Sequence, residues 1–227
     1  MKQCVILAGG RGTRLGSLTD ALPKPLQPVA GRPFMAHLFA KAANSGFTEL
    51  VLLAGYRAEA IEAFAQEEVR RFPGLTVSLS VEPEPLGTAG ALAHASDRLD
   101  PRFLLVNGDT WFDFDWRALR LGDGAMMAMA LRHEPHADRY ETAQLTGDRI
   151  TALEPRDPAR AGGLINGGVY AVDRRALADG ESSLEQQTLP RLCREGRLAG
   201  ARFDGAFIDI GVPESLAAAQ ALAFPEA

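Results

Sequence analysis

Apolar positions along the chain follow two patterns that alternate. Runs of mostly apolar residues, typical of strands buried on both faces of a sheet, occur at Cys4–Leu7, Glu49–Ala54, Thr76–Val81 and Phe103–Val106. After the first run, Phe34, Leu38, Phe39 and Ala42 recur at helical spacing, which predicts a helix that starts near Pro33 and stops at Gly46. A second helical pattern covers Ala58–Val69. Strands that alternate with helices at this interval predict right-handed βαβ units and a parallel sheet.

The second half of the chain is more polar between about Asp138 and Gly163, where Gly147-Asp148 predicts a hairpin turn. Further strands are predicted at Ala125–Leu131, Ile165–Val172 and Ala206–Gly211, and further helices at Ser183–Glu195 and Pro213–Ala223. No repeat, linker or low-complexity segment divides the chain. Residues 1–227 are therefore predicted to form a single domain.

A glycine-rich loop, LAGGRGTRLGSLTDALPKP, follows the first predicted strand at Leu7–Pro25. Its glycines let backbone N–H groups come close to an anion, because no Cβ blocks the approach. Its cations give the density of positive charge that a triphosphate needs when it is taken partly out of water. These residues are Gly9, Gly10 and Gly12, and Arg11, Arg14 and Lys24. The loop is predicted to be a polyphosphate cradle.

Two better-known glycine loops do not fit this spacing. A P-loop needs Gly-Lys before a Ser or Thr, whereas Gly12 is followed by Thr13 and Arg14. A dinucleotide fingerprint begins at Gly10, but its third glycine would fall on Leu15. The alternative is a strand-to-helix turn that is rich in glycine and binds nothing. The added Thr-Arg pair and the Pro-Lys-Pro at positions 23 to 25 favour the cradle.

A second unusual loop, Glu82–Gly90 (EPEPLGTAG), leads into a helix predicted to begin at Gly87 and Thr88. Its two Glu-Pro steps hold the chain extended. The acidic side chains either cap this helix or bind the edge of a nucleobase. A carboxylate at Glu82 suits guanine, because guanine presents two adjacent donors that one carboxylate can accept together.

Two aspartates and two glycines mark the ends and interiors of later strands. Asp109 follows the buried run Phe103–Val106, where a carboxylate at the tip of a central strand is well placed to hold Mg²⁺ against phosphate oxygens. Asp is also an ordinary turn residue, so a plain turn is the alternative. Asp209 lies inside an apolar strand, where a charge needs a partner such as a metal ion. Gly167 and Gly168 indicate that a ligand or another backbone comes close.

Composition limits the classes of partner. With 46% apolar and 23% charged residues, and no apolar run near the ~18 residues of a membrane span, neither a membrane partner nor disorder is predicted. The net charge of −5 argues against nucleic acid. No signal peptide is visible, so a cytoplasmic location is expected. Cys4 and Cys193 lack a CxxC or His partner, which predicts buried reduced thiols. The sequence leaves open whether the chain forms a homo-oligomer.

The cradle, the Pro-Lys-Pro, EPLGTAG, the strand-end Gly-Asp and the late strand aspartate occur in this order over nearly the whole chain. Together they resemble the sugar-phosphate nucleotidyltransferases. Within that superfamily VNGDTWFDFD, INGGVY and FIDIGVPES look most like the bacterial D-glycero-D-manno-heptose 1-phosphate guanylyltransferases. Mannose-1-phosphate guanylyltransferases and muramic acid 1-phosphate uridylyltransferases are close neighbours. The resemblance implies an α/β, Rossmann-like three-layer sandwich of the nucleotide-diphospho-sugar transferase type, with a mostly parallel central sheet.

The resemblance also implies the reaction. A sugar 1-phosphate, with manno-heptose 1-phosphate favoured, attacks the α-phosphorus of an NTP, with GTP favoured, and pyrophosphate leaves. The product is an NDP-sugar for cell-surface polysaccharide synthesis. The alternative is uridylyl or thymidylyl transfer to a sugar 1-phosphate of the muramic acid, glucose or mannose type.

Single residues take roles from the same resemblance. Arg14 and Lys24 would be catalytic, and Asp109 and Asp209 would share Mg²⁺. Nucleotide contacts would come from Leu7, Ala8, Gly9, Gly10, Gly12, Thr13, Glu82, Gly87 and Thr88, and sugar-phosphate contacts from Asn107, Glu154, Asn166, Gly167 and Gly168. Many members carry Glu-Lys where this chain has Glu154-Pro155, so Arg156 is the candidate replacement for that lysine.

Two other classes are weighed from the residues. A dinucleotide-dependent oxidoreductase is disfavoured by the misplaced third glycine. A non-catalytic sensor of nucleotide-sugars is disfavoured because both candidate metal carboxylates and both key cations are present.

Overall fold

A nine-stranded sheet runs through the structure, a computed structural model that describes residues 1–224. The strand order is β5 (Thr76–Val81), β4 (Glu49–Ala54), β1 (Gln3–Leu7), β6 (Arg102–Asn107), β11 (Gly163–Asp173), β8 (Met127–Glu134), β12 (Leu198–Arg202), β10 (Arg149–Glu154) and β9 (Thr142–Thr146). β5, β4, β1 and β6 are parallel, as the alternating pattern predicts. β11 runs antiparallel to both of its neighbours β6 and β8, and β10 runs antiparallel to β12 and β9. The sheet is therefore mixed, and the expected parallel arrangement describes the β5-to-β6 half.

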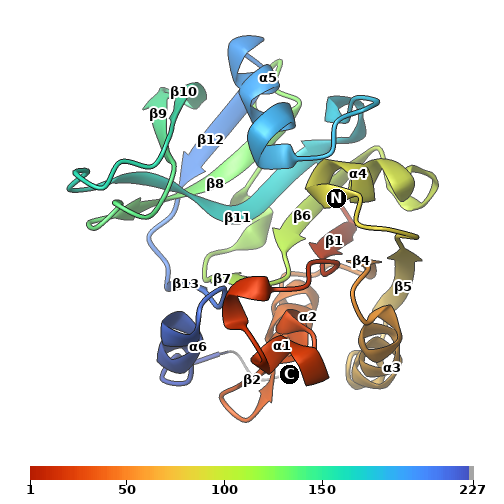
Figure 1. The fold of residues 1–227 in the computed structure, drawn as a ribbon. Helices are drawn as coiled ribbons and strands as arrows, with labels where there is room; N and C mark the ends of the chain where they lie inside the picture. Colours follow the sequence, from red (N-terminus) through yellow and green to blue (C-terminus); the bar gives the residue numbers. More distant parts are fainter. Residues whose placement is uncertain (225–227) are drawn as a thin grey trace.

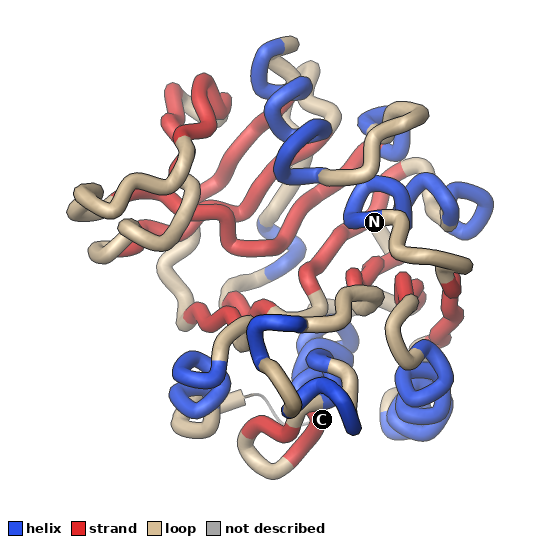
Figure 2. The backbone as a smooth tube through the Cα atoms, in the orientation of Figure 1, coloured by secondary structure: helices blue, strands red, loops and turns tan. Residues whose placement is uncertain are grey.

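Helices cover both faces of the sheet and complete a three-layer α/β sandwich (Figures 1 and 2). One face carries α2 (Phe34–Asn44), α3 (Ala58–Glu68) and α6 (Pro213–Ala219), and the other carries α4 (Gly87–His94) and α5 (Leu189–Arg194). A short helix, α1 (Leu18–Ala21), lies in the loop after β1. None of these helices, within residues 1–224, is long and apolar enough to cross a bilayer.

Each central strand buries both of its faces, as its apolar run predicts. In β1, Cys4 and Ile6 pack in the core that contains Phe34 of α2, whereas Val5 packs in the opposite core with Leu92 of α4. Successive side chains of a strand point to opposite faces, so a sheet covered on both sides requires an unbroken apolar run. This double burial fixes the positions of the strand ends, where the loops begin.

Two further strand pairs lie outside the main sheet. β2 (Pro28–Val29) pairs with β3 (Arg32–Pro33), and β7 (Thr110–Phe112) pairs antiparallel with β13 (Phe207–Asp209). The predicted late strand thus exists, but it is shorter than predicted and joins β7 instead of the central sheet.

Several predicted elements are confirmed, and two helices need correction. α2 begins directly after Pro33, and the hairpin turn at Gly147-Asp148 joins β9 to β10. The helix predicted over Ser183–Glu195 is a π-helical turn at Leu184–Thr188 followed by α5. Pro190 explains the break, because it has no N–H to donate to the preceding turn. The closing helix ends at Ala219 and continues as tighter turns to Leu222.

The two cysteines are free within residues 1–224, as expected, but only one is fully buried. Cys4 lies in the core and burial raises the pKa of its thiol. Cys193 is partly exposed, so the expectation of two buried thiols is wrong for this residue.

Candidate active site

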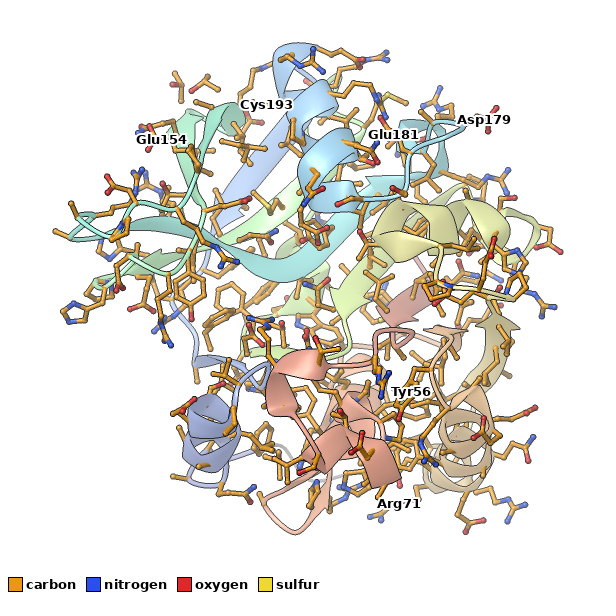
Figure 3. The ribbon with its side chains drawn as sticks, viewed as in Figure 1. Tyr56, Arg71, Glu154, Asp179, Glu181 and Cys193 are labelled. Atoms are coloured by element: carbon orange, nitrogen blue, oxygen red, sulfur yellow. The ribbon has the colours of Figure 1, made fainter. Side chains whose placement is uncertain are left out.

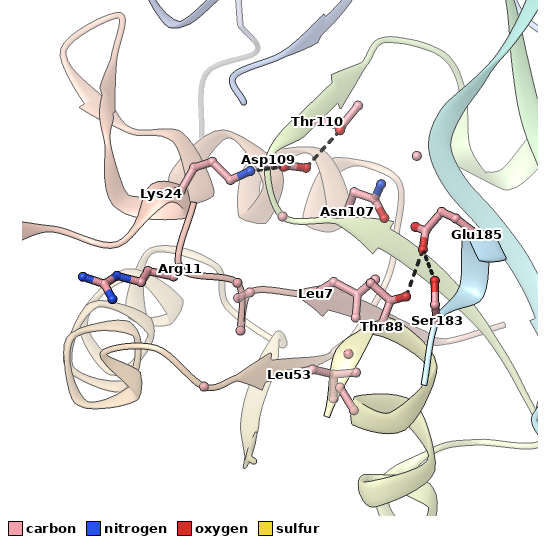
Figure 4. Close-up of a pocket in the computed structure, with 18 of the residues that line it drawn as sticks. Leu7, Arg11, Lys24, Leu53, Thr88, Asn107, Asp109, Thr110, Ser183 and Glu185 are labelled. Carbon is pink, nitrogen blue, oxygen red and sulfur yellow. Dashed lines mark hydrogen bonds and ion pairs between the residues drawn. The ribbon is translucent and has the colours of Figure 1, made fainter. Parts of the chain in front are cut away.

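One cavity of about 1040 Å³ opens at the carboxyl ends of β1, β4 and β6 (Figure 4). Parallel strands end at the same edge of a sheet, so the loops that follow them meet there. The lining contains most of the predicted residues: Leu7, Ala8, Gly9, Gly10, Arg14, Lys24, Glu82, Gly87, Thr88, Asn107, Asp109, Asn166, Gly168 and Asp209. Gly12, Thr13, Glu154 and Gly167 do not line it. The structure thus brings the two loops and the two aspartates together, while their binding roles stay predictions.

The glycine-rich loop after β1 is fixed by backbone hydrogen bonds to the end of β4 and to the loop that follows it. The Ala8 N–H donates to the Leu53 carbonyl at 2.8 Å, and the Tyr56 N–H donates to the Gly9 carbonyl at 3.0 Å. Gly12 has φ +69°, and a Cβ there would lie 3.0 Å from Cβ of Lys24. Gly12 therefore serves the site indirectly, because it lets the loop pass close to the stem of Lys24.

Lys24 and Asp109 form an ion pair at the centre of the cavity. Lys24 Nζ donates to Asp109 Oδ2, and the exposed fractions of the two side chains are 12% and 24%. Thr110 Oγ1 donates to the other oxygen of Asp109, Oδ1, at 3.2 Å. An opposite charge at this depth offsets part of the cost of taking a carboxylate out of water.

Asp209 faces the same centre because of the pairing between β7 and β13. Asp209 lies opposite Thr110 in that ladder, and the Ile210 N–H donates to the Asp109 carbonyl at 2.9 Å. Burial raises the pKa of Asp209, and the negative charge of Asp109 raises it further. Lys24, the Gly211 N–H and Arg14 act in the opposite direction without cancelling the rise. Two carboxylates are therefore held close together in a largely buried position, with Lys24 and Arg14 beside them.

Gly211 lets Arg14 and Asp209 approach each other. Its N–H donates to Asp209 Oδ1 at 2.7 Å. A Cβ at this position would lie 2.7 Å from that oxygen and 2.9 Å from Arg14 Nη2. Sequence reasoning quoted this glycine within a motif and gave it no role. The position of Gly211, two residues after Asp209, was the feature of the sequence that could have indicated such a role.

The carboxylate pair fits a small divalent cation. No third His, Cys, Asp or Glu joins Asp109 and Asp209 in a metal-binding group within residues 1–224. Magnesium is commonly held by one or two carboxylates, with substrate phosphates and water completing the shell. The donor set therefore matches a metal that binds together with a phosphorylated substrate, and it does not match a closed structural site.

Glu82 divides its carboxylate between the protein and the cavity. Oε2 accepts a hydrogen bond from the Leu86 N–H at 3.1 Å, directly before α4. Oε1 lies against the glycine loop: Cβ atoms at Gly55 and Gly9 would come within 2.2 and 2.7 Å of it. Helix capping, the alternative role, thus accounts for Oε2. Oε1 lies against Gly9 and Gly55, which line the cavity.

The far wall of the cavity is built on β6 and β11. Asn166 Nδ2 donates to the buried Tyr170 hydroxyl at 2.6 Å, and Asn166 Oδ1 accepts from the Gly168 N–H at 2.9 Å. The Asn166 side chain is therefore committed to the protein. Asn107 Oδ1 is buried and has no hydrogen-bond partner within residues 1–224.

Glu154 is held by protein contacts and does not line the cavity, so its expected sugar contact stays a prediction. Its carboxylate accepts from Gln144 Nε2 at 2.9 Å and Thr142 Oγ1 at 3.3 Å and pairs with Arg160. These hydrogen bonds lower its pKa. Figure 3 shows Glu154 on the hairpin, well away from Tyr56 on the cavity wall. The side chain links β9, β10 and the following loop instead of lining the cavity.

Several lining residues were missed by sequence reasoning. Tyr140 and Glu141 come from the polar interval before β9, and Ser183, Glu185 and Gln186 come from the π-helical turn. Arg156 also lines the cavity, as its candidacy in place of the family lysine requires. Neither interval carries a motif, and both reach the cavity through the antiparallel half of the sheet. No local signal identified them.

Known proteins resemble this chain in sequence and in fold. Residues 3–224 match the family described as Nucleotidyl transferase, and the chain belongs to that family. It is 33% identical to a D-glycero-alpha-D-manno-heptose 1-phosphate guanylyltransferase of Campylobacter jejuni subsp. jejuni, over 93% of this chain and 96% of that protein. It is 32% identical to a mannose-1-phosphate guanyltransferase of Neurospora crassa, of which it spans 61%.

A solved structure gives the same result for the fold. The crystal structure of HddC from Yersinia pseudotuberculosis complexed with GMP-PN superposes with a TM-score of 0.79 at 27% sequence identity, and it covers 97% of this chain and 98% of that one. The similarity extends over all three layers, so the mixed sheet is a property that the two structures have in common.

Proposed function

We propose that this protein is a sugar-1-phosphate guanylyltransferase that transfers GMP from GTP to a sugar 1-phosphate and releases pyrophosphate. The observation that carries the proposal is the Lys24, Asp109 and Asp209 centre beside the glycine-rich loop. A polyphosphate cradle, a cation and a carboxylate pair within one cavity are the components that nucleotidyl transfer needs. The cavity volume of about 1040 Å³ is at the upper end of ordinary ligand sites and accommodates two substrates.

The reaction is an in-line displacement at phosphorus. A phosphate oxygen of the sugar 1-phosphate forms a bond to the α-phosphorus of GTP while the bond from that phosphorus to the bridging oxygen breaks. The electron pair leaves with pyrophosphate, and no proton transfer is needed. Lys24 and Arg14 would hold the phosphates and stabilise the charge that develops on the α-phosphate oxygens. The glycine-loop N–H groups would orient the triphosphate.

Asp109 and Asp209 would hold the metal ion, for which Mg²⁺ is the proposed species. When bound, the ion would supply positive charge that stabilises the charge developing on the phosphates. Lys24, which pairs with Asp109 in the structure, would contact the phosphates from the same side of the cavity.

Guanine and a manno-heptose are the proposed specificities. The free Oε1 of Glu82, next to Gly9, is placed to accept the two adjacent donors of guanine. Relatives that carry heptose or mannose guanylyltransferase names support the sugar class. The two cysteines without a disulfide within residues 1–224 support the expected cytoplasmic location.

A pyrophosphate-release assay tests this function. GTP, UTP, dTTP and ATP are each paired with D-glycero-α-D-manno-heptose 1-phosphate, mannose 1-phosphate, glucose 1-phosphate and muramic acid 1-phosphate, with and without Mg²⁺. We expect the highest kcat/KM for GTP with the heptose. A preference for UTP or dTTP would favour the uridylyl or thymidylyl alternative, and no release from any pair would refute nucleotidyl transfer.

A further inference from the structure

Two segments far apart in the sequence meet at one wall of the cavity. These are the first turn of α4, which begins at Gly87, and the segment Glu181–Thr188, which contains the π-helical turn. The Ala89 N–H donates to the Ser182 carbonyl at 3.1 Å. Gly87 has φ +76°, and a Cβ there would lie 2.2 Å from the same carbonyl oxygen. The start of α4 is therefore docked onto another part of the protein.

Thr88 makes the central contact between these segments. Its hydroxyl accepts a hydrogen bond from the Leu184 N–H at 2.8 Å and donates to Glu185 Oε2 at 3.0 Å. Ser183 Oγ donates to the same carboxylate oxygen at 3.3 Å (Figure 4). A hydroxyl has one proton to donate, so Thr88 has none left for a nucleotide.

The segment that Thr88 holds contributes three side chains to the cavity, Ser183, Glu185 and Gln186. This wall lies toward β6 and β11: Figure 4 shows the Glu185 side chain beside Asn107, and Asn166 and Gly168 of β11 line the same cavity. The nucleobase end, at Gly9, Gly55 and Glu82, is a different part of the same cavity. Thr88 thus touches the side assigned to the acceptor.

We propose that Thr88 is a positioning residue for the acceptor wall and not a nucleotide ligand. Through its hydroxyl it fixes the backbone at Leu184 and aims the Glu185 carboxylate, so that the wall is formed before the sugar 1-phosphate arrives. This inference rests on the proposed function for the identity of the acceptor, and it replaces the nucleotide role that the sequence assigned to Thr88. A π-helical turn is an irregular backbone form that is frequent at functional sites. Here the Thr88 hydroxyl is one of the groups that hold its start, together with Ser183 Oγ and Gln187 Oε1.

Thr88→Val and Thr88→Ser separate this role from others. Valine keeps the shape and removes both hydrogen bonds, whereas serine restores the hydroxyl. We expect Thr88→Val to raise KM for the sugar 1-phosphate by about 10-fold, the scale of one lost bond to a charged group. The dissociation constant for GTP, measured by calorimetry without acceptor, should change less than about twofold, and Thr88→Ser should behave like wild type.

Thr188→Val is the matched control. Thr188 is fully buried in the same segment and donates to Glu181 Oε2 at 2.7 Å, and it does not line the cavity. This variant loses a comparable threonine-to-glutamate bond, so it reports the general effect on stability. We expect its melting temperature to fall without the acceptor-specific change in KM.

Hydrogen exchange gives a readout that does not depend on turnover. A peptide that covers Ser182–Thr188 should exchange faster in Thr88→Val than in wild type or Thr88→Ser, because the Leu184 N–H loses its acceptor. An increase in the GTP dissociation constant equal to the increase in acceptor KM would overturn the inference, as would unchanged exchange in this peptide. If wild type turns over no sugar 1-phosphate, the proposed function fails, while the exchange and GTP-binding measurements still decide the role of Thr88.

Discussion

Replacing Glu82 with glutamine tests base recognition with little change in shape. The Leu86 N–H needs an acceptor, and in the wild type Oε2 supplies it at 3.1 Å. A glutamine keeps this bond only if its amide oxygen takes the place of Oε2. Its NH₂ group then occupies the place of Oε1, against Gly9 and Gly55.

The magnitude follows from this forced orientation. In the wild type, a carboxylate oxygen would accept hydrogen bonds from guanine N1–H and from the N2 amino group. In the variant, the glutamine NH₂ group, itself a donor, would face these two donors of guanine. Hydrogen bonds to charged groups are worth roughly 1.5–3 kcal/mol, so kcat/KM for GTP should fall by about 10- to 100-fold. Uracil and thymine present carbonyl acceptors beside N3–H, so UTP and dTTP should lose less or gain.

The assay is kcat/KM for GTP, UTP and dTTP with saturating acceptor in wild type and Glu82→Gln. Glu67→Gln is the control for lost charge, because Glu67 is exposed in an ion pair with Arg70 and does not line the cavity. An unchanged ratio of GTP to UTP in Glu82→Gln would refute base recognition by this carboxylate. The capping contact to Leu86 would then be its whole role.

Four further predictions concern the charged centre, one glycine and a distant ion pair. Asp109→Asn and Asp209→Asn should each lower Mg²⁺-dependent kcat by about 100-fold or more with an unchanged circular dichroism spectrum, since an amide is a poor ligand for a hard dication; a rate near wild type would exclude that carboxylate as a ligand. Lys24→Ala and Arg14→Ala should each lower kcat more than they raise KM. Lys24→Arg should not restore kcat, because a planar guanidinium does not fit the place of an ammonium between Pro23 and Pro25. A change in KM alone would assign these cations to substrate binding. Gly168→Ala should lose activity, because the new Cβ would lie 3.2 Å from both Asn107 Nδ2 and Thr110 Cβ. Gly124→Ala is the control: Gly124 has a similar φ of +72° and no atom within 4 Å of an added Cβ, so this variant should lose only stability in a thermal melt. Equal losses of activity in the two variants would count against crowding of the site. Arg175 beside Asp173 lowers the pKa of that carboxyl to about 2 from 3.8, so the pair stabilises the fold above pH 3.8 and this contribution is lost as the pH falls through about 2. Asp173→Asn should flatten the dependence of the urea midpoint on pH in this acid range, and an unflattened slope would assign that dependence to other carboxylates.

The parallel half of the sheet could be predicted from the sequence because its signals are local. A strand buried on both faces must be apolar at every position, and Cys4–Leu7 and Phe103–Val106 satisfy this requirement. The loops that follow carry glycines and charged residues whose chemistry is readable without partners. This is why the glycine loop, Lys24, Glu82 and Asp109 were brought to one cavity as expected.

The antiparallel half could not be predicted in the same way. β11 is inserted between β6 and β8, and strand order of this kind depends on contacts between residues far apart in the sequence. Glu154 shows the consequence. Its position in a motif suggested a sugar contact, but Arg160, six residues later, folds back and takes up the carboxylate. Tyr140 and Glu185 reach the cavity through the same long-range pairing, with no pattern of their own.

The cavity extends to the junction of the two halves, between β6 and β11. The register of β11 shifts between Asn166 and Tyr170 as it runs between β6 and β8, and Gly168 adopts φ +70° within this irregular stretch. The shift turns the backbone of β11 away from regular pairing just where β6 ends at Asn107, two residues before Asp109. A regular antiparallel ladder would fill this space with side chains. Gly168, which lines the cavity and whose added Cβ would lie 3.2 Å from Asn107 Nδ2, instead leaves room there. Under the proposed function, this space between the proposed metal carboxylates and the wall held by Thr88 is where the attacking phosphate would lie.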